Sequence, residues 1–169
     1  MLALLGLLAY GLVASDPDRG IDDALARGET VAAPGFELER LSGGGKEALA
    51  DYRGKLVVLN AWASWCGPCR KESPLMERWH KRISRDGRAT VLGINALDAT
   101  ADARSFVREY GLTYPMLRDS EGESLIGYGV VSYPETFVID ERGRIVALLR
   151  GEVDERWMRE NVAPLLERS

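Results

Sequence analysis

The fold is decided by residues 56–74, whose sequence is LVVLNAWASWCGPCRKESP. Residues 56–62 are mostly apolar and rich in strand-forming side chains, so they predict a buried strand. Apolar residues then recur at helical spacing from about residue 66 to residue 85 and predict a helix. The expected apolar face of that helix comprises Leu75, Met76, Trp79 and Ile83. The stretch therefore predicts a strand, a tight turn and a helix.

Cys66 and Cys69, the only two cysteines of the 169 residues, fall at this turn. A disulfide that closes so small a loop constrains little of the unfolded chain and stabilises a fold weakly. The spacing instead suits exchange chemistry, in which one thiolate attacks a substrate disulfide and the other thiol resolves the mixed disulfide. Pro68 fits the first turn of a helix. Cys66 would then lie at the helix N-terminus, where free amides and the helix dipole favour a thiolate and lower its pKa.

Two blocks of sequence resemble the thioredoxin superfamily, and in particular its TlpA/ResA/DsbE-like branch. The first is residues 59–74, which contain W-C-G-P-C, and the second is residues 129–140, GVVSYPETFVID, which are similar to the branch pattern G-V-x-x-x-P-E-T-F-x-I-D. The resemblance covers roughly residues 34–165. It implies an α/β, thioredoxin-like fold, with a central mixed β-sheet flanked by helices and an N-terminal β-hairpin extension. It also implies an extracytoplasmic thiol–disulfide oxidoreductase, and we expect no cofactor.

The expected catalytic residues are Cys66 as nucleophile, Cys69 as resolving thiol and Glu72 as proton carrier. Glu72 follows Cys69 by three residues and shares its helix face, and the resembled branch has an active-site glutamate there. Ordinary thioredoxins place a buried aspartate at the position of Asn60. Because asparagine cannot titrate, Glu72 is the candidate for proton transfer. The alternative is an ordinary surface glutamate in a first helical turn.

The resemblance also implies a cis-proline beside the cysteines, at Pro134, with the backbone of the preceding Tyr133 pairing with a substrate chain. Without the resemblance, Tyr133 and Pro134 would indicate a plain turn. For Glu135 the alternative is a solvent-facing strand residue. The residues expected around the dithiol and along the substrate groove are Trp65, Gly67, Pro68, Tyr133, Pro134 and Glu135.

Other uses of a cysteine pair fit less well. A structural zinc site needs four ligands, and the chain has two cysteines and one histidine, His80, so we expect no metal. A copper site needs soft ligands with a matching histidine, whereas His80 lies in the polar stretch 78–82, which predicts an exposed helix face. A peroxiredoxin would, by family resemblance, carry threonine where this chain has Ala63. A metallochaperone, and a general disulfide oxidant or exchange enzyme of the same fold, stay open as alternatives.

The N-terminus differs from the rest of the chain. Residues 1–15 are apolar and uncharged, are shorter than the roughly 20 residues that span a bilayer, and lack the basic start of a signal peptide. They indicate a membrane anchor or a signal segment, and we favour the anchor because no clear Ala-x-Ala site follows. Residues 16–33 are polar and predict a linker, and residues 34–169 predict one thioredoxin-like domain. The net charge of −4 leaves no basic footprint for nucleic acid.

The remaining elements follow from periodicity and turn residues. Residues 36–41 alternate like a strand, the glycine-rich residues 42–45 turn the chain, and residues 46–51 predict a short helix. The other expected elements are a strand over 89–95, a helix over 100–111, strands over 136–139 and 144–149, and a helix over 155–166.

The function expected from the resemblance is reduction of protein disulfides on the periplasmic or cell-envelope side of a membrane, with the N-terminus as anchor. Apocytochrome c is the best-supported substrate. A thiol protein of the membrane would have to donate electrons, because the surroundings oxidise the dithiol.

Overall fold

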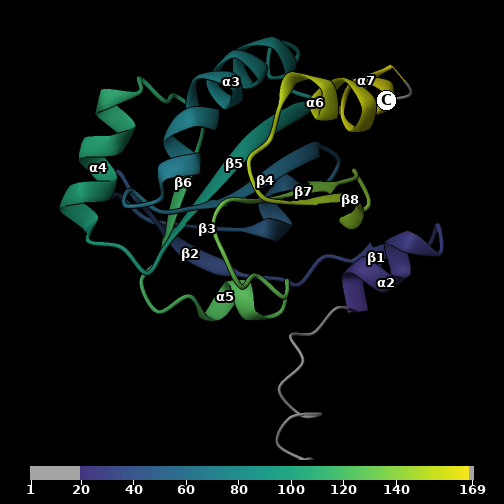
Figure 1. The fold of residues 1–169 in the computed structure, drawn as a ribbon, viewed down its shortest axis with the longest axis horizontal. Coiled ribbons are helices and arrows are strands. Elements are labelled where there is room, and N and C mark those ends of the chain that lie inside the picture. The colour runs from purple at the N-terminus through teal and green to yellow at the C-terminus, as the bar shows by residue number, and fades with distance from the viewer. Residues whose placement is uncertain (1–19, 168–169) are drawn as a thin grey trace, which may run out of the picture.

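A computed structural model describes residues 20–167, and an eight-stranded mixed sheet runs through it with helices on both faces (Figure 1). The strand order is β1-β8-β7-β4-β5-β6-β2-β3. The strands are β1 (Val31–Ala32), β2 (Glu37–Arg40), β3 (Lys46–Ala48), β4 (Leu56–Trp62), β5 (Ala89–Ala96), β6 (Met116–Asp119), β7 (Glu135–Ile139) and β8 (Arg144–Arg150). The helices are α2 (Gly20–Ala26), the 3-10 helix η1 (Leu49–Tyr52), α3 (Gly67–Ile83), α4 (Thr100–Glu109), α5 (Glu123–Ile126), α6 (Glu155–Asn161) and α7 (Ala163–Leu166).

The central strand is β4, and all of its residues are buried. It runs parallel to β5 on one side and antiparallel to β7 on the other. Because helices cover both faces of the sheet here, β4 is apolar almost without interruption rather than alternating. The strand and the helix expected on either side of the cysteines are confirmed as β4 and α3.

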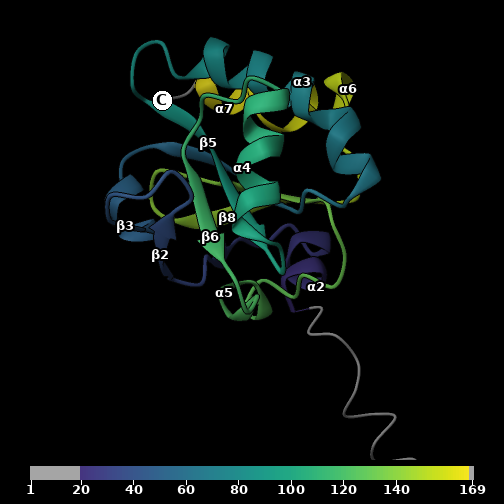
Figure 2. The ribbon, with the colours of Figure 1, turned by 90° about the vertical axis from the view of Figure 1, so that its left-hand side faces the viewer.

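Two helical layers sandwich the sheet. Helices α3, α4, α6 and α7 cover one face, and α2, α5 and η1 cover the other (Figure 2). In the first layer the predicted apolar face of α3 is buried, together with Phe106 of α4 and Met158 of α6. In the second layer Leu125 of α5 and Tyr128 pack against Phe137 of β7. The site described below lies at the N-terminal end of α3, between the sheet and its loops.

The expected fold class is confirmed, including the N-terminal hairpin, which consists of β2 and β3. Two of the expected elements take a different form in the structure. Residues 46–48 are a strand rather than the start of a helix, because their backbone pairs with β2. The helix expected over 155–166 is broken into α6 and α7 at Val162, since Pro164 lacks the N–H that a continuous helix needs.

Part of the polar stretch expected as a linker, residues 16–33, forms helix α2 and strand β1. Ile21 and Ala24 of α2 are buried, at the helical spacing of i and i+3, and β1 pairs with β8. These few apolar residues stand among charged ones in the sequence, so the pattern did not predict a helix. The expected anchor or signal segment, residues 1–15, lies outside the described residues. Among the residues that are described, none of the helices has the length and apolar character needed to cross a membrane.

Candidate active site

The two cysteines form a disulfide at the first turn of α3. Cys66 is the N-cap of the helix, and its sulfur accepts a hydrogen bond from the backbone N–H of Cys69 at 3.1 Å. A donor aimed at this sulfur, together with the helix dipole, favours the thiolate once the disulfide is reduced. Both cysteines are largely buried, with Cys66 4% exposed and Cys69 1% exposed.

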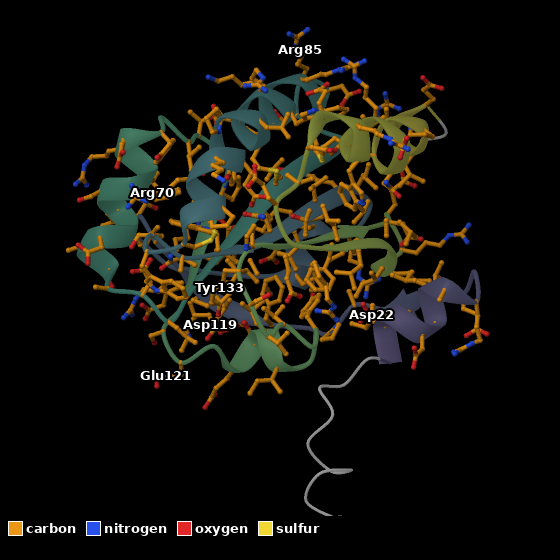
Figure 3. All side chains as sticks on the ribbon, in the orientation of Figure 1. Asp22, Arg70, Arg85, Asp119, Glu121 and Tyr133 are labelled. Carbon is orange, nitrogen blue, oxygen red and sulfur yellow. A yellow bond between two sulfur atoms is a disulfide. The ribbon has the colours of Figure 1, made fainter. Side chains whose placement is uncertain are left out.

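The two sequence blocks meet beside the disulfide. Antiparallel pairing of β4 with β7 places Ala61 opposite Glu135, so the loop before β7 lies next to the loop that carries the cysteines. The Tyr133–Pro134 peptide bond is cis, as the resemblance implied. Trp65 is 61% exposed, and its ring meets that of Tyr133 edge-on at 5.7 Å. Figure 3 shows where Tyr133 lies, below the N-terminal part of α3.

Glu72 is a buried carboxylate rather than a surface residue, with only 2% of its area exposed. One oxygen accepts a hydrogen bond from the Asn60 side-chain amide at 2.8 Å, and the other accepts one from the backbone N–H of Val153, also at 2.8 Å. The Asn60 amide donates in addition to the Thr136 hydroxyl at 3.1 Å. The glutamate, three residues beyond Cys69 on α3, is thus held by β4 and by the loop after β8.

Burial raises the pKa of Glu72 to about 7, because removing a carboxylate from water disfavours its charged form. The hydrogen bonds from Val153 and Asn60 act in the opposite direction and limit the rise. A group with this pKa changes its protonation state near neutral pH, as a proton carrier must. Each carboxylate oxygen retains a second lone pair with which to accept a proton.

Glu135 takes a different place from the one expected. It was expected to line the substrate groove, but its side chain is fully buried. One carboxylate oxygen accepts hydrogen bonds from the backbone N–H groups of Val131 and Ser132, at 3.2 and 3.3 Å. The other oxygen is ion-paired with Arg150. Glu135 therefore holds the loop that leads into Pro134 instead of presenting itself to a substrate.

Asp98 is a residue of the site that sequence reasoning missed. Its carboxylate accepts hydrogen bonds from the backbone N–H of Ser64 at 2.6 Å and from the Ser64 hydroxyl at 2.8 Å. Next to it, the carbonyl of Leu97 accepts a hydrogen bond from the indole N–H of Trp65 at 3.1 Å. The loop after β5 thus holds the loop that precedes the cysteines.

Metal binding gains no support from the described residues, 20–167, where no group of three or more His, Cys, Asp and Glu side chains could hold an ion. His80 was expected on an exposed helix face, but it is half-buried against the ring of Tyr114 at 5.6 Å. Burial lowers its pKa. It lies on α3 fourteen residues beyond Cys66, about 21 Å along a helix axis. His80 is therefore too far away to bind the same metal ion as the cysteine sulfurs.

Comparison with known proteins gives the same assignment. The family model described as AhpC/TSA family matches residues 30–148. The chain belongs to the AhpC/TSA family. It is 33% identical over 162 residues to the thiol-disulfide oxidoreductase ResA of Geobacillus thermodenitrificans, covering 96% of this chain and 90% of that protein.

Two solved structures are similar in fold. A secreted thiol-disulfide isomerase from Corynebacterium glutamicum superposes with a TM-score of 0.73 at 32% identity, over 80% of this chain and 85% of that one. A thiol:disulfide interchange protein DsbE from Chlorobium tepidum gives 0.74 at 28% identity, over 81% and 96%. The chain is therefore a thiol–disulfide oxidoreductase of the ResA/DsbE type, and the expected resemblance to that branch is confirmed. Ala63, where a peroxiredoxin carries threonine, agrees with this assignment.

The buried Glu72 predicts how stability depends on pH. Its folded-state pKa of about 7 lies above the ordinary 4.5, so the native state holds this proton more tightly than the unfolded state does. The stabilisation is complete below about pH 4.5 and is lost as pH rises through 7, with a total on the order of 3 kcal/mol. Denaturant unfolding of the oxidised protein from pH 4 to 9 should show this fall, and Glu72→Gln should remove it.

Glutamine at position 72 places an amide N–H against the Asn60 amide or the Val153 N–H, which lowers the free energy of unfolding at every pH. The quantity to compare is therefore the slope of that free energy with pH. Glu121→Gln, at an exposed position, is the matched control and should retain the parent's slope. Parallel pH profiles for Glu72→Gln and the parent would show that folding does not raise the pKa of this carboxylate.

Proposed function

We propose that this protein reduces disulfides in extracytoplasmic proteins, and that apocytochrome c is its substrate. The observation that carries the proposal is the C-G-P-C pair at a helix N-terminus, next to the cis-proline loop and above a buried glutamate. Similarity to ResA and DsbE supports the same direction of reaction. The C-x-x-C-H haem-attachment motif supplies a substrate dithiol of suitable spacing.

The reaction is an exchange of two electrons. The Cys66 thiolate attacks one sulfur of the substrate disulfide, which forms a mixed disulfide and releases the other substrate sulfur as a thiolate. Cys69 then attacks Cys66, the mixed disulfide breaks, and the second substrate thiol leaves. The protein ends with the Cys66–Cys69 disulfide, and the substrate ends with two thiols, which hold the two electrons and two protons that the protein's dithiol has lost.

Glu72 acts in the second step of this proposal. Cys69 must lose its proton before it can attack, and it is buried in the first turn of α3, three residues before Glu72 on the same helix face. The ionised carboxylate accepts that proton. Asn60 cannot do so, but its amide holds the carboxylate in place.

The location is the extracytoplasmic side of a membrane, with residues 1–15 as the anchor and a thiol protein of that membrane as electron donor. Two observations support it. Residues 1–15 are apolar and uncharged, and the similar protein from Corynebacterium glutamicum is described as secreted. Such compartments oxidise dithiols, so the donor must return two electrons to the Cys66–Cys69 disulfide after each turnover.

The proton-transfer role of Glu72 is tested by the pH dependence of exchange. For the parent, the rate of resolution should rise as pH passes through about 7, where Glu72 ionises. Glu72→Gln should be slower by about tenfold or more above pH 7 and should lack the rise. Stopped-flow measurement of substrate thiol release gives both profiles, and coincident profiles would remove Glu72 from the mechanism.

The substrate is identified by trapping. In Cys69→Ala, Cys66 still attacks a substrate disulfide, but no thiol resolves the adduct, so mixed disulfides should accumulate in a host that exports the protein. Mass spectrometry of the reducible adducts should find proteins with a C-x-x-C-H motif. The matched variant Cys66→Ala should trap little.

Two outcomes contradict the proposal. If Cys66→Ala captures partners while Cys69→Ala captures none, the roles of the two thiols are wrongly assigned. If Cys69→Ala captures many unrelated exported proteins with no preference for haem-attachment motifs, the protein is a general exchange enzyme.

A further inference from the structure

Arg150, the last residue of β8, joins three separate parts of the chain with one guanidinium group. Its Nη2 and Nε atoms donate to the Asp22 carboxylate of α2, at 2.5 and 3.0 Å. Its Nη1 atom donates to the backbone carbonyl of Gly129 at 2.9 Å and to the buried carboxylate of Glu135. A planar guanidinium makes such a paired contact with a carboxylate and keeps its other nitrogen in a fixed direction.

The carboxylate of Glu135 connects Arg150 to the loop that precedes Pro134. It accepts hydrogen bonds from Val131 and Ser132. With the contact from Arg150 to Gly129, the loop 129–133 is therefore held by its backbone at three points. This loop ends at Tyr133, whose ring meets Trp65 beside the cysteines.

Asp22 belongs to helix α2, which packs on the face of the sheet opposite to α3. Helix α2 is fastened to the sheet by Ile21 and Ala24, which are buried, so the position of Asp22 is set by the core. Figure 3 shows Asp22 on α2 at the edge of the molecule, away from Tyr133. The Asp22 and Arg150 side chains are 34% and 26% exposed, so their pair is partly shielded from water.

Charge explains why the Asp22 contact matters to the loop. Glu135 is a fully buried carboxylate, and Arg150 is the cation that neutralises it. Arg150 can rotate toward solvent, because a quarter of its side chain is exposed. The paired contact with Asp22 prevents that rotation and holds Nη1 on Glu135 and Gly129.

We propose that Asp22 and Arg150 are positioning residues that set the shape of the substrate groove, so that helix α2 controls recognition of protein substrates. The proposal rests on the proposed function for its kinetic part. The residues act through Glu135 and the loop 129–133 and do not touch the reacting sulfurs. A disulfide too small to fill the groove should therefore be insensitive to them.

The test compares Asp22→Asn with Asp23→Asn, which removes the same charge from the same first turn of α2. For an oxidised peptide that contains a C-x-x-C-H disulfide, Asp22→Asn should raise KM at least fivefold and leave kcat within twofold. Its rate with oxidised glutathione should stay within twofold of the parent. Amide hydrogen exchange at Val131 and Ser132 should accelerate at least tenfold, and Asp23→Asn should match the parent in every measurement.

Two further variants separate positioning from loss of folding. Asp22→Glu keeps the carboxylate and should restore KM and amide protection. Arg150→Lys keeps the charge but has no planar fork, and it should behave as Asp22→Asn does. Circular dichroism at the assay temperature confirms that each variant is folded.

The proposal is overturned if Asp22→Asn matches Asp23→Asn in KM and in amide exchange. It is also overturned if KM rises while exchange at Val131 and Ser132 does not change, or if the rate with glutathione falls as much as the rate with peptide. If the parent itself fails to reduce the peptide, the proposed function fails, and the amide-exchange measurement alone decides the positioning role.

Discussion

The antiparallel pairing of β4 with β7 is the constraint on which the rest of the site depends. It brings together two segments separated by about 70 residues of sequence, one ending in the cysteine loop and the other beginning at Pro134. Its register places Asn60 opposite Thr136, and the Asn60 amide bonds the Thr136 hydroxyl while reaching Glu72. One strand pair therefore sets the positions of both the loop before Pro134 and the buried carboxylate of Glu72.

The two buried glutamates near the cysteines, Glu72 and Glu135, are each held by more than one partner. Glu72 has donors from two elements, and Glu135 has two backbone donors and a cation. A buried carboxylate without such partners is strongly destabilising. The two glutamates nevertheless differ in chemistry. Glu72 has no cation among its bonded partners and its pKa rises, whereas Glu135 is neutralised by Arg150.

Local signals in the sequence were sufficient for β4, α3 and the cysteine pair. Helical spacing also placed Glu72 next to Cys69, and the resemblance placed the cis bond before Pro134. Burial was not predictable in the same way. Glu135 belongs to a recognisable motif, but nothing in its spacing shows that it faces inward to the loop rather than outward to a substrate.

Contacts between distant residues account for what the sequence could not reveal. Asp98 bonds Ser64 across 34 positions, and Arg150 bonds Asp22 across 128 positions. Ser64 lies in the first motif block, but no periodic pattern or motif marks Asp98 as its partner or pairs Asp22 with Arg150. Helix α2 was not predicted for a related reason. Its few apolar residues do not form a recognisable pattern by themselves, and they are buried only because the helix packs on the sheet.

The central claim is that the Cys66–Cys69 pair donates electrons to protein disulfides. Its reduction potential tests this most directly, measured by equilibrating the protein in dithiothreitol redox buffers at pH 7 and quantifying free thiols by alkylation. A reductant should give about −250 mV or lower, in the range of thioredoxin. A value near about −120 mV, as in strongly oxidising exchange proteins, would contradict the account and make this protein a disulfide donor.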